Sequence, residues 1–87
     1  MSGHDLIREI VEKHGKDRYP TIDLSFMKLM EEIGELCQAI LKVKSKKDVM
    51  KEYGDIGLSL YNLGDKMGLD LDECMKMVVD EETRKFS

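Results

Sequence analysis

The sequence has no Trp, two Phe, three Tyr, one Pro and two Cys among its 87 residues. With so little aromatic bulk, a core must be filled by Leu, Ile and the seven Met residues. A chain of this length fits one domain, residues 1–87, and a domain this small buries only a modest fraction of its surface when it folds alone. The shortage therefore favours association with a second copy of the chain.

Basic residues are too few and too scattered for a nucleic-acid surface. The formal net charge is −4, whereas nucleic-acid binding requires clustered Lys and Arg. One basic cluster occurs at the end of an expected helix, where cations complement the helix dipole; it comprises Lys42, Lys44, Lys46 and Lys47. We therefore predict no nucleic-acid partner.

Long apolar runs are also missing. No stretch approaches the roughly 20 residues of a transmembrane helix, and the N-terminal residues lack the apolar segment of a signal peptide. Cys37 and Cys74 fall at apolar helical positions without a Cys-x-x-Cys neighbour. We expect them to be buried free thiols in a reducing compartment. The prediction is a soluble, cytoplasmic protein that makes no membrane contact.

Apolar residues keep helical spacing along the chain, and no strand-like alternation occurs. We therefore predict an all-α fold of four helices, near residues 5–14, 23–43, 46–67 and 71–84. Pro20 marks the break after the first helix, and Gly68 stands where a helix C-terminal glycine occurs. Ser45 and Asp70 are expected to begin the third and fourth helices as caps.

Two pairs of carboxylates dominate the central helices. Glu32 and Glu35 are three residues apart, as are Glu52 and Asp55, so each pair projects from one side of its helix. On a helical wheel the two pairs fall at matching angles, with Glu32 and Glu52 at the margin of the apolar stripe. A short turn joins the helices, which should therefore pack antiparallel and bring the four acids to similar heights.

Four converging carboxylates favour a divalent cation. Hard oxygen ligands without His or Cys suit Mg²⁺, or Mn²⁺ in its place, and the absence of a Glu-x-x-His motif speaks against a ferritin-like di-iron site. The chain has 18 acidic residues, so a single Glu-x-x-Glu would arise readily by chance. The coincidence of two matched pairs is what indicates a metal site.

The same residues carry a family resemblance. Glu31-Glu32-x-x-Glu35, followed after sixteen residues by Glu52-x-x-Asp55, resembles the signature of MazG-type nucleoside triphosphate pyrophosphohydrolases. The similarity extends over about residues 26–77, and it implies a short member of the all-α nucleotide pyrophosphatase superfamily. That superfamily includes dimeric dUTPases and phosphoribosyl-ATP pyrophosphohydrolase. In such proteins these carboxylates bind Mg²⁺, and the resemblance assigns that role to Glu32, Glu35, Glu52 and Asp55.

The resemblance implies hydrolysis of a nucleoside triphosphate to a monophosphate and pyrophosphate. We expect Glu31 or Glu35 to accept the proton of the attacking water. Phosphate contacts are expected from Lys28, Lys76 and Arg84, although Lys28 is equally well placed for an i to i+4 salt bridge with Glu32.

Other polar and aromatic residues have weaker assignments. Tyr19 and Phe26 are candidates for stacking on a base, although Phe26 falls near the apolar stripe and is expected in the core. Tyr61 and Asn62 are weaker candidates. His4 and His14 are expected to be solvated and to carry no chemistry.

The last helix departs from the family pattern. Relatives often have an Asn there, whereas this chain has Asp80 and Glu81. A non-catalytic helical module that binds metal or nucleotide is therefore an alternative, and phosphoribosyl-ATP is an alternative substrate.

Apolar residues outside the main stripes indicate burial on more than one side of the central helices. They include Met27, Leu41, Leu58 and Tyr61. We predict a dimer in which two copies of the central helix pair form a four-helix bundle. Single-domain relatives include dimers and tetramers, so the resemblance implies a homodimer or homotetramer.

Overall fold

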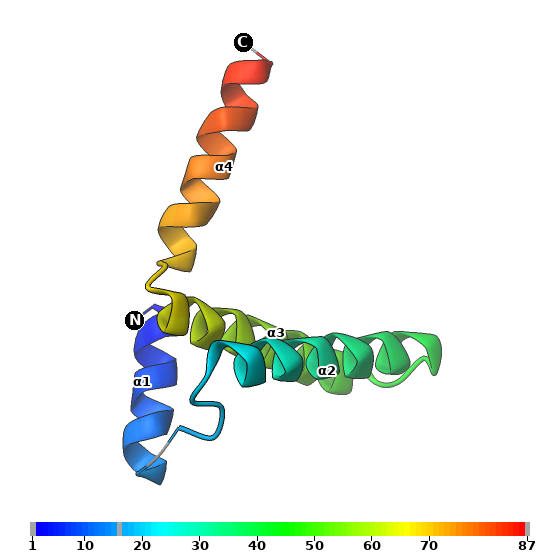
Figure 1. Cartoon of the computed structure of the whole chain (residues 1–87). Coiled ribbons are helices and arrows are strands. Elements are labelled where there is room, and N and C mark those ends of the chain that lie inside the picture. Colours follow the sequence, from blue (N-terminus) through cyan, green and yellow to red (C-terminus); the bar gives the residue numbers. More distant parts are fainter. Residues whose placement is uncertain (1, 16, 87) are drawn as a thin grey trace.

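The computed structural model describes residues 2–15 and 17–86. These residues form four α-helices and no strand, which confirms the predicted all-α class (Figure 1). The helices are α1 (Gly3–His14), α2 (Ile22–Leu41), α3 (Lys46–Met67) and α4 (Leu71–Lys85). Every predicted boundary falls within two residues of the observed one. None of the described helices is long and apolar enough to cross a membrane.

Side-chain caps explain where the helices begin. Ser45 and Asp70 accept hydrogen bonds from backbone N–H groups at the start of α3 and α4, as predicted. Thr21 caps α2, and Ser2 forms a reciprocal capping box with Asp5 at the start of α1. Neither of these last two caps was predicted from the sequence.

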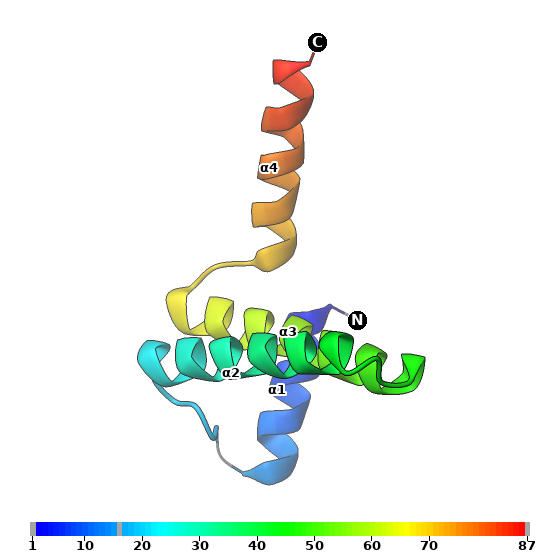
Figure 2. The same cartoon turned by 90° about the vertical axis from the view of Figure 1, so that its right-hand side faces the viewer.

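The central pair α2 and α3 runs antiparallel side by side, as the short connection predicts (Figures 1 and 2). Helix α1 packs across α3, whereas α4 projects away from the other three helices. Only three hydrophobic residues are buried among those described, namely Leu29, Ala39 and Leu63. Helix α4 buries none. One chain therefore supplies the antiparallel pair but does not close a four-helix bundle, and the predicted dimer stays a prediction.

Several side chains expected in the core are exposed in the single chain. Cys37 is exposed, Cys74 is only partly buried, and Phe26 is 51% exposed. The prediction of burial is wrong for these residues within one chain, because the described residues leave the outer face of α2 and much of α4 uncovered.

His4 shows the opposite error, since it is buried rather than solvated. Its Nε2 atom accepts the backbone N–H of Leu71 at 3.0 Å, so the ring proton is on Nδ1, which donates to Asp65. The ring edge packs on Tyr61, with centroids 4.7 Å apart. These contacts of His4 with Asp65, Leu71 and Tyr61 form a joint that ties α1, α3 and the start of α4 together. Local sequence patterns could not predict this contact, because Asp65 and Leu71 are more than sixty residues away along the chain.

Gly64 allows the joint to close. A Cβ atom at this position would lie 3.0 Å from the carbonyl oxygen of Leu69 and 3.5 Å from the His4 ring. Gly68 then ends α3 with a φ of 70°, in the left-handed region that favours glycine.

Candidate metal centre and adjoining cavity

Three carboxylates meet between the two central helices. Glu32 comes from α2, and Glu52 and Asp55 come from successive turns of α3. One oxygen of each lies within 4.8 Å of the others. Glu32 is 5% exposed, and the other two are partly buried. The antiparallel packing therefore brings together three of the four acids that the sequence nominated as metal ligands.

Two oxygens of this cluster have no partner. Glu32 Oε2 and Glu52 Oε2 are buried and accept no hydrogen bond. A buried charged oxygen without a partner is costly, by about 1–3 kcal/mol or more. The atoms that a cation would satisfy are thus already in place.

The donor set fits Mg²⁺ or Mn²⁺. All three ligands are hard carboxylate oxygens, which these ions prefer. Mg²⁺ binds oxygen at about 2.1 Å in an octahedron, so adjacent ligands lie about 3.0 Å apart and opposed ones about 4.2 Å apart. The three oxygens, which lie within 4.8 Å of one another, would draw closer together around a bound ion.

Lys28 neutralises the cluster from one side. Its Nζ atom lies 2.8 Å from Glu32 Oε1 and 3.6 Å from Glu31 Oε1, and it sits over the Tyr19 ring at 5.7 Å from the centroid. The hydrogen bond to Glu32 raises the pKa of Lys28 well above its ordinary value. The structure therefore shows the i to i+4 salt bridge, and the phosphate contact stays a prediction.

Glu35 lies beside the cluster rather than in it. It is exposed, and it lines a separate hollow together with Glu31 and Glu52. The negative charge of Glu32 is the main cause that raises the pKa of Glu35 above its ordinary value, and the neighbouring Glu52 carboxylate adds to the shift. Glu35 therefore holds a proton more strongly than a solvated glutamate does.

The two basic residues assigned to α4 are not brought to this site within one chain. Lys76 and Arg84 lie on the projecting helix, and neither lines the cavity beside the acids. Their assignment to substrate phosphates stays a prediction.

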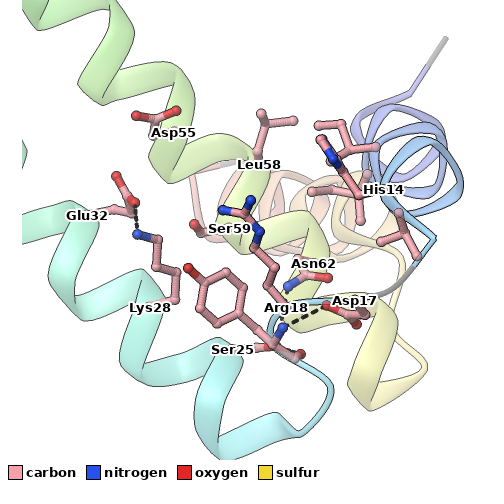
Figure 3. Close-up of a pocket in the computed structure, with 14 residues that line it drawn as sticks. His14, Asp17, Arg18, Ser25, Lys28, Glu32, Asp55, Leu58, Ser59 and Asn62 are labelled. Carbon is pink, nitrogen blue, oxygen red and sulfur yellow. Dashed lines mark hydrogen bonds and ion pairs between the residues drawn. The ribbon is translucent and has the colours of Figure 1, made fainter.

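A cavity of about 260 Å³ opens next to the acids, between α1, the α1–α2 connector, α2 and α3. Glu32 and Asp55 line one end of it and Asn62 and Asp17 lie toward the other, with the Arg18 guanidinium between them (Figure 3). Its apolar wall comes from Ile7, Ile10, Val11 and Leu58, and its remaining lining residues are His14, Tyr19, Ser25, Lys28 and Ser59. The volume lies just below the roughly 300–1,000 Å³ typical of small-molecule sites.

The connector that forms the cavity edge is held in place by ionic contacts. Asp17 pairs with Lys66 of α3 and accepts the backbone N–H of Tyr19 at 2.9 Å. Burial opposes ionisation of Asp17, but the Lys66 ammonium and the Tyr19 N–H outweigh it and hold its pKa below the ordinary value. Tyr19 and Arg18 are thus held beside the acids by a tertiary contact.

Sequence reasoning missed most of this cavity. Arg18 and Ser25 received no assignment, and His14 was expected to have no role although it contributes to the lining. Asn62 was noted only as a weak candidate for contact with a base. The one available signal for the cavity was Asn62, a polar residue on the inner face of α3.

An all-α chain with paired helical carboxylates facing a small cavity has the features of the MazG-like all-α NTP pyrophosphatase superfamily. The comparison with known families agrees with that class. The chain matches the phosphoribosyl-ATP pyrophosphohydrolase family over residues 4–82 and belongs to it. This family is hydrolytic and acts on phosphoric anhydrides.

The chain is also similar to an uncharacterized protein, YvdC, of Bacillus subtilis strain 168. The two are 29% identical over 96 aligned residues, which cover 92% of this chain and 89% of the relative. No solved structure matches the chain.

Proposed function

We propose that this protein is a Mg²⁺-dependent pyrophosphohydrolase that converts a nucleoside or deoxynucleoside triphosphate to the monophosphate and pyrophosphate. The observation that carries the proposal is the pair of buried, unpartnered oxygens on Glu32 and Glu52 next to a cavity of nucleoside scale. A purely structural cluster would have paired these atoms.

Glu32, Glu52 and Asp55 would hold the ion, with Glu35 as a further ligand or neighbour. A divalent cation there neutralises triphosphate oxygens and favours attack by water on phosphorus. Glu35 is the better general base of the two candidates, because its raised pKa makes its carboxylate more basic. Glu31 instead faces the Lys28 ammonium.

We infer the orientation of the substrate from the lining of the cavity. Glu32 and Asp55 line the cavity as well as the metal centre, so the triphosphate belongs at that end. The nucleoside then extends along the apolar wall toward Tyr19 and Arg18. Once a cation has bound to Glu32, the Lys28 ammonium can leave this carboxylate and contact a phosphate oxygen instead.

A second candidate substrate is phosphoribosyl-ATP, which the family match favours. The two candidates share the metal centre and the bond that is broken. They differ in what occupies the far end of the cavity.

The test is a panel of common NTPs, dNTPs and phosphoribosyl-ATP, incubated with Mg²⁺ or Mn²⁺ and assayed for pyrophosphate. We expect turnover of at least one compound, and none with the Asp55→Asn variant. Metal binding without turnover of any compound would instead identify the non-catalytic binding module.

We further propose that the active form is a homodimer or homotetramer. Large apolar side chains are exposed along α2 and α4, including Met27, Ile40, Leu41, Met77 and Val79. Association would cover them and could bring Lys76 and Arg84 of one copy to the site of another. Light scattering at micromolar concentration tests this, since a monomeric mass would contradict it.

We place the protein in the cytoplasm. Both cysteines are free, which is typical of a reducing compartment. Fluorescence microscopy of a tagged chain tests this location.

A further inference from the structure

A chain of hydrogen bonds runs from Lys66 through two residues that line the cavity, Asn62 and Ser25. Lys66 Nζ donates to Asn62 Oδ1 at 2.9 Å, Asn62 Nδ2 donates to Ser25 Oγ at 3.4 Å, and Ser25 Oγ donates to the carbonyl oxygen of Tyr19 at 2.9 Å. Its direction is fixed at both ends, because an ammonium only donates and a carbonyl only accepts. The Asn62 amide therefore cannot flip without breaking two bonds.

The fixed orientation of the Asn62 amide leaves one of its two N–H groups outside the chain of hydrogen bonds. An amide nitrogen carries two hydrogens, and Ser25 takes one of them. Asn62 is 8% exposed and Ser25 is 1% exposed, so the remaining N–H is nearly shut off from bulk water. Both residues line the cavity, and Figure 3 shows them on the side away from Glu32 and Asp55.

The charged groups nearest Asn62 either donate or are already used. Arg18 brings guanidinium N–H donors, which lie between Asn62 and the acids in Figure 3, and it forms no ion pair with the described residues. The Asp17 oxygens are engaged by Lys66 and by the Tyr19 N–H. The acceptors that remain without partners, on Glu32, lie at the opposite end. One end of the cavity is thus acidic and the other offers donors.

We propose that Asn62, held by Lys66 and Ser25, is a specificity-determining residue that selects substrates carrying a hydrogen-bond acceptor at the donor end of the cavity. The acceptor is a keto oxygen of the base or a second phosphate group, and an exocyclic amino group is rejected because it would face another donor. This inference rests on the proposed function and deepens it.

Nucleotide pairs that differ at one ring substituent test the keto source. UTP carries a keto oxygen where CTP carries an exocyclic amino group, and ITP and ATP differ in the same way. We expect kcat/KM to favour the keto member by about tenfold or more, since an unmatched polar group in a site built for hydrogen bonding is strongly disfavoured. The Asn62→Asp variant replaces the free donor with an acceptor of the same shape, so the keto-to-amino ratio should fall at least tenfold.

Two further variants separate selectivity from folding. Lys66→Met releases the amide to flip and should lower the ratio, although less than Asn62→Asp does. Lys13→Met changes an exposed lysine of α1 that does not line the cavity, and it should leave the ratio unchanged. In each variant, helical circular dichroism reports on the fold and Mn²⁺ binding reports on the metal centre. If Asn62→Asp does not fold, Lys66→Met provides the test of the keto-to-amino ratio.

A second phosphate as the acceptor gives a different pattern. Phosphoribosyl-ATP would then be preferred over ATP, the keto-to-amino ratios would be near one, and Asn62→Asp would act most strongly on phosphoribosyl-ATP through charge repulsion. Either pattern supports the donor end.

An equal loss of kcat/KM for every compound in Asn62→Asp, with all ratios unchanged, would overturn the inference and make Asn62 structural. If no compound is turned over, the proposed function fails, and the same ratios are measured as dissociation constants by calorimetry. Unchanged ratios there, or no nucleotide binding at all, would overturn the inference as well.

Discussion

Two regions of this small protein bury ionisable groups, and they differ in how completely those groups are paired. At the joint between α1, α3 and α4, both ring nitrogens of His4 have partners, in Asp65 and the Leu71 N–H. In the acidic cluster, Glu32 and Glu52 each keep a buried oxygen without one. Since buried polar atoms are normally satisfied, the joint is complete in itself and the cluster is complete only with a ligand.

Removing a metal ligand, or the acidic neighbour Glu35, should have the largest effect. We expect Asp55→Asn and Glu35→Gln to lower kcat by about 10²–10³-fold, because a bound cation supplies several kcal/mol of transition-state stabilisation. Both variants should bind Mn²⁺ more weakly in an electron paramagnetic resonance titration and keep their helical circular dichroism. Loss of the helical signal would instead make the acids structural.

Removing the joint should act on stability alone. His4→Ala leaves Asp65 and the Leu71 N–H without their partner, so the free energy of unfolding should fall by about 2–4 kcal/mol. Urea titration measures the loss. His14→Ala, at an exposed histidine, is the control and should leave the free energy of unfolding nearly unchanged. A large change in Mn²⁺ affinity in His4→Ala would show that the two regions are coupled.

Cation binding should stabilise the fold, and more so at neutral than at acidic pH. The raised pKa of Glu35 means that the folded chain keeps this proton to higher pH than the unfolded chain, whose Glu has the ordinary value of 4.5. The unfolding free energy of the metal-free protein should therefore fall as pH rises above that value.

Mg²⁺ at 100 times its dissociation constant adds about 2.7 kcal/mol. The increase in Tm should thus be larger at pH 7 than at pH 5 at one fixed Mg²⁺ concentration, and scanning calorimetry can compare them. An increase independent of pH would argue against binding at these acids.

Replacing the internal counter-ion should give the smallest effect. Lys28→Met removes an ammonium that lies 2.8 Å from Glu32 and competes with a cation for it. We expect Mn²⁺ to bind about tenfold more tightly, which corresponds to about 1.4 kcal/mol. Lys28→Arg keeps the charge and should bind Mn²⁺ as the original chain does. Unchanged affinity in Lys28→Met would place this side chain outside the metal equilibrium.

Local patterns predicted the elements and three of the acids that converge. Helical periodicity and caps are short-range signals, so the four helices and the Ser45 and Asp70 caps could be read directly. The convergence of Glu32, Glu52 and Asp55 followed from wheel angles and the short turn between two antiparallel helices.

Long-range contacts account for what the sequence did not reveal. The burial of His4 depends on residues from α3 and α4, and the position of Arg18 depends on Asp17 meeting Lys66 across the fold. No periodicity encodes such pairs. The exposure of Cys37 and Phe26 has a different cause: an apolar stripe indicates that a face will be covered without saying whether the same chain covers it.

The thin core has a calorimetric consequence. Only Leu29, Ala39 and Leu63 are buried apolar residues among those described, and the heat capacity increment of unfolding scales with the apolar surface newly exposed to water. A single chain should therefore show a small increment and a flat stability curve. Burial of the outer faces of α2 and α4 by other copies would steepen that curve, so the increment should grow with protein concentration across the association range.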